Sequence, residues 1–456
     1  MHTRLLVRLA LCLVLSVSAH LGAQSRSRMA LIKAGHLVDP RTGHVLAPAA
    51  ILAEDGHIKE VGAPSLVQRR TPPEAVVIEL GDATLLPGLI DAHAHLLLDV
   101  VVPPEAEIRR HDNGRFAPGL LLAIVESPTK RAFIGAQLAR EDLDSGITTV
   151  RNLGHSGIDG DTQLRDAINA GRIMGPRILA SGRKLIARGS YVTGLNPVLT
   201  DAILEQEFLL VDGVDSARRA VRQNTLQNVD VIKVTDGENL SVAELSAIVD
   251  EAHRQHLKVA VHAADVVSIQ TAIDAGADSV EHGNAVTDAQ LEQMREKGIV
   301  LDLTPTFYDD FWQKITTPSL VMSRAFQDEN ASSDARAKTH IDGLVERVMK
   351  SGVKVAAGSD MCWFYPGKTR GQASVETFVN LQAAGMSPLQ VLRSVSSNAA
   401  EMIGWQDRVG AIEAGKFADV IAGAGDPLAD VTELLHVRFV MKDGEVVRND
   451  FKTKSR

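Results

Sequence analysis

Six side chains suited to metal binding or acid–base chemistry stand at the carboxyl ends of apolar, β-rich runs: His93, His95, Lys233, His262, His282 and Asp360. His93 and His95 are two residues apart, and because side chains alternate along a strand, both imidazoles point to the same side. Two such nitrogens can share one metal ion. Neutral imidazole and carboxylate suit zinc, and also manganese, iron or cobalt, so the set predicts a metal site without identifying the metal.

Each of these residues also has a structural interpretation. A lone buried histidine is more often a satisfied core residue than a ligand, and Lys233 could pair with Asp236 or Glu238. Lys233 lies in VDVIKVTDG and would enter a largely apolar interior, where an unpaired ammonium is costly and its pKa falls. A neutral amine beside a metal can react with carbon dioxide to form a carbamate, and a Schiff-base lysine is a further alternative. As a set on one rim, the six residues favour a metal site.

The elements that must position these residues follow a regular pattern. Eight apolar runs alternate with amphipathic segments such as 241–256, 288–298 and 372–385, which predicts an α/β fold: a (β/α)8 TIM barrel over residues 85–404. The carboxyl ends of barrel strands meet at one mouth. A doubly wound sheet would instead need a glycine-rich phosphate turn where DAHAHLLLD stands. The eight runs are 85–98, 146–154, 176–185, 229–237, 257–265, 277–284, 298–307 and 353–361.

The two ends of the chain differ from this middle part. Residues 24–84 and 405–456 consist of short β-rich runs separated by turn residues, including a hairpin-like turn at Lys442-Asp443-Gly444. They predict one small β-sandwich domain that the chain leaves and re-enters.

Residues 1–23 are typical of a secretory signal peptide. Arg4 and Arg8 precede an apolar stretch that is too short to span a bilayer, and small residues follow it. We therefore expect a secreted or periplasmic protein with no membrane association after signal removal. Of the two cysteines only Cys362 would remain, so no internal disulfide is expected.

Composition narrows the partners. The 456 residues include 48 Lys+Arg against 57 Asp+Glu, a net charge of −9, and no Lys/Arg-rich run. Nucleic-acid binding is therefore not expected. A homo-oligomer is compatible with the sequence, but no motif specifies one.

The order of the six residues resembles the amidohydrolase superfamily, in its binuclear-metal branch with a carboxylated lysine. The motifs PGLIDAHAH, ADSVEHGN, GSD at 358–360 and SSNAAEMIG extend this resemblance over essentially the whole mature chain. Within the superfamily the chain is most similar to imidazolonepropionase-like and Xaa-Pro dipeptidase-like amidohydrolases, a group related to enzymes that hydrolyse ochratoxin.

The resemblance implies a role for each candidate residue. His93, His95 and Asp360 would hold one divalent metal, and His262 and His282 the other, with zinc favoured for both. Carboxylated Lys233 and a hydroxide would bridge the two metals. Asp360 would act as the general base and then the general acid, so Asp360 and Lys233 are the candidate catalytic residues.

The activity implied by the resemblance is that of an exported, metal-dependent amidohydrolase. Its substrate would be a small amide or dipeptide: an N-acyl amino acid or dipeptide cleaved as by a carboxypeptidase or dipeptidase, ochratoxin-type amides included. Alternatives are a cyclic amidase and a lactonase or phosphotriesterase-like hydrolase. A non-enzymatic metal-binding scaffold of the same fold is a further alternative.

Substrate contacts are predicted from loops that follow the second and third strands. Arg151, His155 and Tyr191 could bind a carboxylate or an oxyanion, although Arg151 could equally form a barrel-end salt bridge and the other two could be loop surface. The aromatic residues 363–365 could line an apolar pocket or pack against the barrel. The histidines expected on helices, as solvated or capping residues, are His253, His256 and His340.

Overall fold

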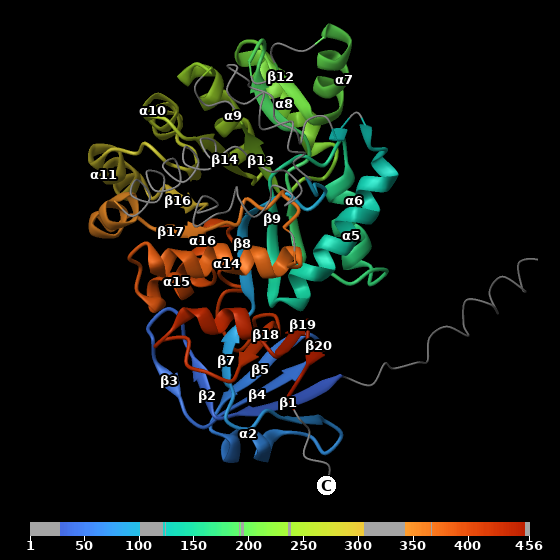
Figure 1. Ribbon diagram of the computed structural model, residues 1–456, viewed down its shortest axis with the longest axis vertical. Helices are drawn as coiled ribbons and strands as arrows, with labels where there is room; N and C mark the ends of the chain where they lie inside the picture. The colour runs from blue at the N-terminus through green and yellow to red at the C-terminus, as the bar shows by residue number, and fades with distance from the viewer. Residues whose placement is uncertain are drawn as a thin grey trace, which may run out of the picture.

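The computed structural model describes residues 28–100, 122–123, 125–190, 192, 196–235, 239–304, 343–365 and 367–451. Two units lie along the long axis of the molecule (Figure 1). The smaller, lower unit contains strands from both ends of the chain, drawn in blue and red, and the larger unit contains parallel strands with helices around them. In the described part of the chain, no helix combines the length and the apolar character needed to cross a bilayer.

The smaller unit consists of two sheets. The first has the order β5-β4-β1-β6 and contains β1 (Met29–Ala34), β4 (Ala49–Glu54), β5 (His57–Gly62) and β6 (Val76–Glu79), with α2 (Pro64–Arg70) beside it. The second has the order β20-β19-β18-β7-β2-β3. Its strands are β2 (His36–Val38), β3 (Val45–Leu46), β7 (Thr84–Pro87), β18 (Val420–Gly423), β19 (Phe439–Lys442) and β20 (Glu445–Asn449). Because β7 pairs with β18, both ends of the chain enter one sheet.

Local sequence explains the hairpins of this unit. Asp55-Gly56 joins β4 to β5 and Asp443-Gly444 joins β19 to β20, and all four residues have positive φ, from 48° to 83°. Two positive φ values in a two-residue loop are what a type I′ turn requires, and Asp-Gly is a preferred pair for it. The predicted turn at residues 442–444 is thus confirmed. One apolar cluster, which includes Ile32 and Phe439, packs the two sheets against each other.

The larger unit is built from parallel strands in two sheets, β10-β9-β8 and β12-β11-β13-β14-β15-β16-β17. The strands are β8 (Leu89–Ala94), β9 (Ile147–Asn152), β10 (Arg177–Ala180), β11 (Lys184–Ala187), β12 (Phe208–Val211), β13 (Val231–Val234), β14 (Lys258–Ala263), β15 (Ser279–His282), β16 (Val300–Leu303) and β17 (Val355–Ala357).

Backbone hydrogen bonds join both edges of the three-stranded sheet to the seven-stranded one. The amide of Asp230, just before β13, donates to the carbonyl of Ala180 in β10 at 2.7 Å. The amide of Asp360, just after β17, donates to the carbonyl of His93 in β8, also at 2.7 Å. The strands therefore form a TIM-barrel-like α/β arrangement.

Three details differ from the predicted strands. The run 85–98 divides at Gly88, where a Cβ atom would lie 2.1 Å from Thr148 Oγ1, so β7 belongs to the smaller unit and only β8 to the larger one. The predicted boundary at residue 84 consequently falls inside β7. The run 176–185 divides into β10 and β11. β12 was not predicted because its four residues are too few to give a periodic signal.

Helices surround these strands (Figure 1). The predicted helices 241–256, 288–298 and 372–385 correspond to α9, α11 and α14. Each begins with a reciprocal capping box, for example between Ser241 and Glu244, which satisfies amides at the start of the helix. The helices are α5 (Pro128–Asp144), α6 (Gly160–Asn169), α7 (Pro197–Glu207), α8 (Val214–Thr225), α9 (Val242–Arg254), α10 (Val266–Ala275), α11 (Asp288–Lys297), α14 (Arg370–Ala383), α15 (Pro388–Ser394) and α16 (Ser397–Met402), and η2 (Val431–His436) is a 3-10 helix.

Two of the three histidines expected on helices lie in the described part of the chain, and both are exposed. His253 is exposed on α9 and lies 2.9 Å from a carboxylate oxygen of Asp278, and His256 is exposed directly after that helix. His340 lies outside the described residues.

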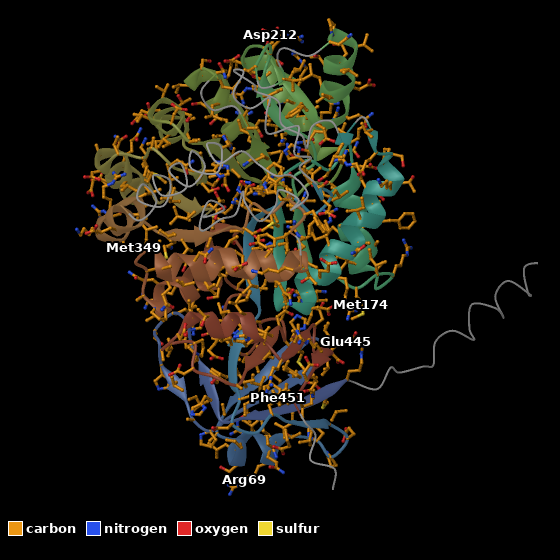
Figure 2. All side chains as sticks on the ribbon, in the orientation of Figure 1. Arg69, Met174, Asp212, Met349, Glu445 and Phe451 are labelled. Atoms are coloured by element: carbon orange, nitrogen blue, oxygen red, sulfur yellow. The ribbon has the colours of Figure 1, made fainter. Side chains whose placement is uncertain are left out.

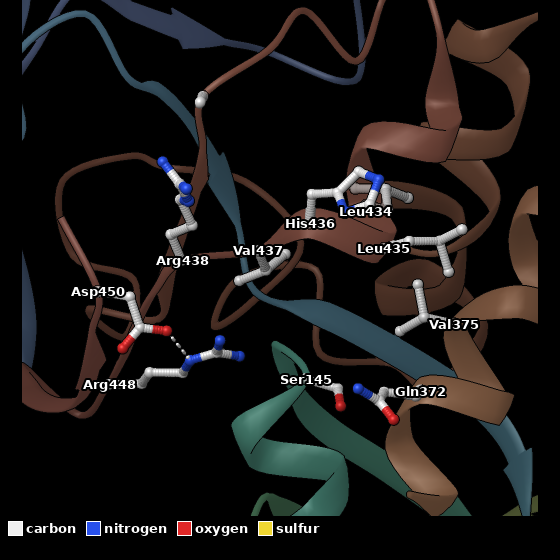
Figure 3. A pocket seen from close by; sticks show the side chains of 11 residues that line it. Ser145, Gln372, Val375, Leu434, Leu435, His436, Val437, Arg438, Arg448 and Asp450 are labelled. Carbon is white, nitrogen blue, oxygen red and sulfur yellow. Dashed lines mark hydrogen bonds and ion pairs between the residues drawn. The ribbon is translucent and has the colours of Figure 1, made fainter. Parts of the chain in front are cut away.

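The two units meet at the amino-terminal side of the parallel strands. A cavity of about 560 Å³ lies there (Figure 3), and its lining includes Ser145 after α5, Gln372 on α14 and the ion-paired Arg448 and Asp450. Nearby, Arg177 at the start of β10 makes ion pairs with Asp419 and Asp443 of the smaller unit.

Arg177 and Asp419 form a buried ion pair at this junction. It is 7% exposed, Asp419 is 5% exposed, and the guanidinium carbon lies 3.8 Å from the centroid of the Phe417 ring. Burial raises the pKa of Asp419, while Arg177 acts in the opposite direction. Removal of the arginine would leave a buried carboxylate without its main compensating charge.

We expect Arg177→Met to lower the free energy of unfolding by about 3 kcal/mol, because breaking a buried ion pair leaves the partner charge uncompensated. The loss should be larger at pH 8 than at pH 5. Without Arg177 the pKa of Asp419 in the folded protein rises further above its unfolded value, so stability falls as the pH rises. Urea denaturation at the two pH values measures both effects.

The matched control is Arg188→Met. Arg188 pairs with Asp212 through side chains that are 63% and 68% exposed, so its loss should change stability by less than about 0.5 kcal/mol. Figure 2 shows Asp212 at the opposite end of the molecule from Arg69 of the smaller unit. Equal stability of the Arg177 and Arg188 variants would contradict the expected contribution of the buried Arg177 ion pair to stability.

Candidate functional site

The six predicted residues all lie at the carboxyl ends of parallel strands. His93 lies in β8, and His95 directly follows the last residue of that strand. Lys233, His262 and His282 belong to β13, β14 and β15, and Asp360 follows β17 by three residues. Together with Lys233, the four histidines and Asp360 line a cavity of about 170 Å³. The structure therefore brings all six residues to one place.

Asp360 lies among the imidazole rings. Its Oδ1 is 3.1 Å from His95 Nε2 and 3.5 Å from His93 Nε2, and its Oδ2 is 3.9 Å from His282 Nδ1. The ring centroid of His262 is 4.5 Å from that of His282. Ligand atoms of His93, His95 and Asp360 all fall within 4.8 Å of one another, which is a spacing that one metal ion can bridge.

The backbone is adapted to this convergence. A Cβ atom on Gly358 would lie 2.3 Å from the Cβ of His93, so only glycine allows the end of β17 to approach β8 this closely. His282 and Asp360 both have positive φ, of 73° and 50°. This conformation is uncommon for residues other than glycine and concentrates at functional sites, where the surrounding structure maintains it.

The electrostatics of the cavity keep the histidines neutral. Burial lowers the pKa of His93 to about 4 and that of His262 to about 3, and it also lowers the pKa of His95 and His282. Although burial favours a neutral Asp360, the surrounding imidazoles lower the pKa of its carboxyl well below the ordinary value. Neutral imidazoles and an ionised carboxylate are the forms in which these groups bind metal.

Lys233 is the least satisfied of the six. It is 2% exposed, and its Nζ has no hydrogen-bond partner among the described residues. Burial lowers its pKa to about 8, even though Glu281 and Asp360 act in the opposite direction. An orphaned amine beside four neutral imidazoles and a carboxylate fits a site for divalent cations in which the lysine also takes part.

A buried layer of charged residues supports the histidines. Glu281 Oε2 lies 2.9 Å from His93 Nδ1, so this carboxylate can orient the ring in the way that outer-shell carboxylates orient metal-binding histidines. Burial and the neighbouring Glu281 raise the pKa of Asp302 well above its ordinary value, whereas Arg151 and His93 keep the pKa of Glu281 low despite its burial. His93, Glu281 and Asp302 also have the spacing of a cation site, but Arg151 already supplies a cation there.

Arg151 belongs to this buried ion-pair network and is not among the described residues that line the cavity. It is 2% exposed, and its guanidinium donates to the Ala92 carbonyl, to Ser279, to Glu281 at 2.7 Å and to Asp302 at 3.3 Å. All three guanidinium nitrogens are used inside the larger unit. The structure therefore shows the barrel salt bridge that the sequence analysis gave as the alternative for this residue.

The other predicted substrate contacts differ in their surroundings. His155 lines the cavity, and its ring centroid lies 4.9 Å from that of His95. Tyr191 lies outside the described residues. Of the aromatic residues 363–365, Trp363 lines the cavity, Phe364 is exposed, and Tyr365 is buried in an apolar cluster with Leu98.

Sequence reasoning missed three polar residues of this region: Lys184, Glu281 and Asp302. Lys184 begins β11 and lines the cavity. The sequence signal for it is its place at the end of the third predicted strand, because the other candidate residues also stand at strand ends. Glu281 directly precedes His282, but nothing in the sequence shows that it contacts His93, 188 positions away.

Comparison with known proteins agrees with this geometry. Residues 84–447 match the amidohydrolase family. The chain is 30% identical to ochratoxinase from Aspergillus niger, with 94% of this chain and 88% of ochratoxinase covered, and 27% identical to imidazolonepropionase from Symbiobacterium thermophilum, with 86% and 89% covered.

A solved structure extends the similarity to three dimensions. A Xaa-Pro dipeptidase with bound methionine in the active site is 27% identical, has a TM-score of 0.71, and is covered over 100% of its length by 92% of this chain. The family match spans most of the chain and includes every candidate metal ligand identified above. The chain therefore belongs to the amidohydrolase family.

Proposed function

We propose that this protein is a metal-dependent hydrolase that cleaves the amide or peptide bond of an N-acyl amino acid or a dipeptide. The observation that carries the proposal is the convergence of four neutral histidines, Asp360 and the orphaned Lys233 on one buried cavity. Membership of the amidohydrolase family supports hydrolysis of an amide bond. The similar proteins named ochratoxinase and Xaa-Pro dipeptidase support the choice of substrate class.

The candidate ligands would hold two divalent metals, for which zinc is the first choice. His93, His95 and Asp360 would hold one metal, His262 and His282 the other, and a carboxylated Lys233 would serve both. When bound, such ions supply a water that is nucleophilic at neutral pH and polarise the scissile carbonyl.

The residues of the chain would then orient the groups and move the proton. Glu281 would hold the ring of His93 with its Nε2 directed towards Asp360. Asp360 would take the proton of the attacking water and later pass it to the leaving amine, since its carboxylate lies at the centre of the ligand set. The buried walls of the cavity would limit competing bulk water.

We also propose a barrel architecture and an exported location for this protein. The parallel strands would form a closed (β/α)8 barrel, with the two-sheet unit as a β-sandwich built from both chain ends. The charge pattern of residues 1–23 supports export to the periplasm or the medium.

Metal analysis and a substrate panel test the function. We expect about two equivalents of divalent metal per chain, with hydrolysis abolished by a chelator and restored by zinc. The panel would contain N-acyl amino acids, dipeptides ending in proline, phenylalanine or a basic residue, a cyclic amide, a lactone and a phosphotriester. Hydrolysis of only the last three would overturn the substrate class. Tight metal binding without any hydrolysis would favour the non-enzymatic scaffold.

Asp360→Asn should retain bound metal but lower kcat by about 10³-fold or more, because an amide cannot accept and return the proton. Metal content measured on the same sample separates loss of the proton carrier from loss of the ligand. A variant with a near-normal rate would refute the role of Asp360.

Lys233→Ala should reduce the metal content from about two equivalents to about one, because the carboxylated lysine would no longer supply a ligand. Addition of a short carboxylic acid such as propionate should restore part of the second metal. Lys258→Ala, which removes a partly exposed lysine paired with Asp278, is the matched control and should keep both metals. Full metal content in Lys233→Ala would show that the lysine is not a ligand.

A further inference from the structure

Lys184 is a second lysine in the wall of the candidate active site. It is the first residue of β11, is 2% exposed, and lines the same cavity as the candidate ligands. Its Nζ lies 2.7 Å from His155 Nε2 and 4.9 Å from the centroid of the Phe208 ring. The proposed reaction uses neither Lys184 nor His155.

The surrounding backbone makes room for this side chain. Gly154 has a φ of +94°, and a Cβ atom there would lie 2.4 Å from Lys184 Cγ. Any larger residue would therefore displace the lysine stem. Because glycine also adopts positive φ without strain, Gly154 meets both requirements of the position.

His155 is held against Lys184 by a buried ion pair. It has a φ of 57°, and its carbonyl accepts a hydrogen bond from Arg131 Nη2. Arg131 Nη1 donates to Glu207 Oε1 at 2.6 Å, and both of these residues are buried. The contact between Lys184 and His155 is thus part of a rigid, built site and not a surface encounter.

The charges of the cavity favour an anionic ligand. Two lysines, Lys184 and Lys233, are among its described lining residues, and Lys184 is the one that the proposed metal site does not use. Burial lowers the pKa of Lys184 to about 7, while Glu207 and Asp360 act in the opposite direction and favour its cationic form. Leu98, Val100 and Trp363 form an apolar part of the same wall. A molecule with one anionic group and an apolar side chain matches both features.

We propose that Lys184, positioned by His155, binds the free carboxylate of the amino-acid half of the substrate. This inference rests on the proposed amide hydrolysis and narrows it. The enzyme selects amides whose leaving amine carries a neighbouring carboxylate, and it discriminates against carboxamides, neutral cyclic amides and neutral esters.

Kinetics with a matched pair of substrates test this assignment. N-acetyl-L-phenylalanine and N-acetyl-L-phenylalaninamide differ only in the carboxylate, and release of acetate reports on both. The wild type should prefer the acid by roughly 10- to 100-fold in kcat/KM, as expected for one charged hydrogen bond. Lys184→Met should remove this preference, mainly through a higher KM for the acid, and should change hydrolysis of the amide by less than about threefold.

Two further variants serve as controls. Arg183→Met removes the adjacent charge, whose Nη1 donates to the Glu205 carbonyl and which does not line the cavity, so it should behave as the wild type. Lys184→Arg keeps a cation and should keep part of the preference. An equal loss on both substrates in Lys184→Met would overturn the proposal, since it would indicate oxyanion stabilisation or a structural role.

A binding experiment separates this inference from the proposed function. Calorimetry with L-phenylalanine and L-phenylalaninamide on the metal-loaded protein requires no turnover. Tighter binding of the acid by the wild type, with this preference lost in Lys184→Met, supports the inference even if neither acetylated compound is hydrolysed. The lack of hydrolysis would then count against the proposed substrate class alone. The absence of any Lys184-dependent preference for the carboxylate in both assays would overturn it.

Discussion

The close approach of β8 and β17 is the constraint on which the candidate site depends. The amide of Asp360 donates to the carbonyl of His93 at 2.7 Å. The backbone at Gly358 lies so close to the Cβ of His93 that no side chain would fit at that position. This contact brings together residues more than 260 positions apart in the chain. Because side chains alternate along a strand, a shift of one residue in either strand would turn its ligands away from the cavity.

A second requirement is that the polar groups buried around the cavity have hydrogen-bond or ion-pair partners. Asp91 accepts hydrogen bonds from Ser359 Oγ at 2.6 Å and from the amide of His93, which ties the two strands together below the cavity. Arg151, Glu281 and Asp302 form the next part of this buried layer. Hydrogen bonds and ion pairs join these groups, and the contact between Glu281 and His93 Nδ1 orients the ring of that histidine.

The smaller unit lies at the other end of the strands. β8 begins where β7 leaves the six-stranded sheet, and Arg177 at the start of β10 pairs with Asp419 of the smaller unit. In TIM-barrel folds the amino-terminal face carries stability and the carboxyl-terminal face carries chemistry. The same division explains why the larger junction cavity contains the ion-paired Arg448 and Asp450, while the smaller cavity contains the candidate metal-binding histidines.

The sequence by itself determined the six candidate ligands, the alternation of strands and helices, and the pairing of the chain ends. These features depend on local properties: residue type, spacing within a strand, and turn motifs such as Asp443-Gly444. The tertiary structure alone decided which polar residues face the cavity. For Arg151 the sequence allowed a substrate contact or a salt bridge, and the structure pairs it with Glu281 and Asp302. Lys184 was not predicted, but it lines the cavity. The physical reason is that burial and charge partners come from strands distant in sequence, and no local pattern encodes those contacts.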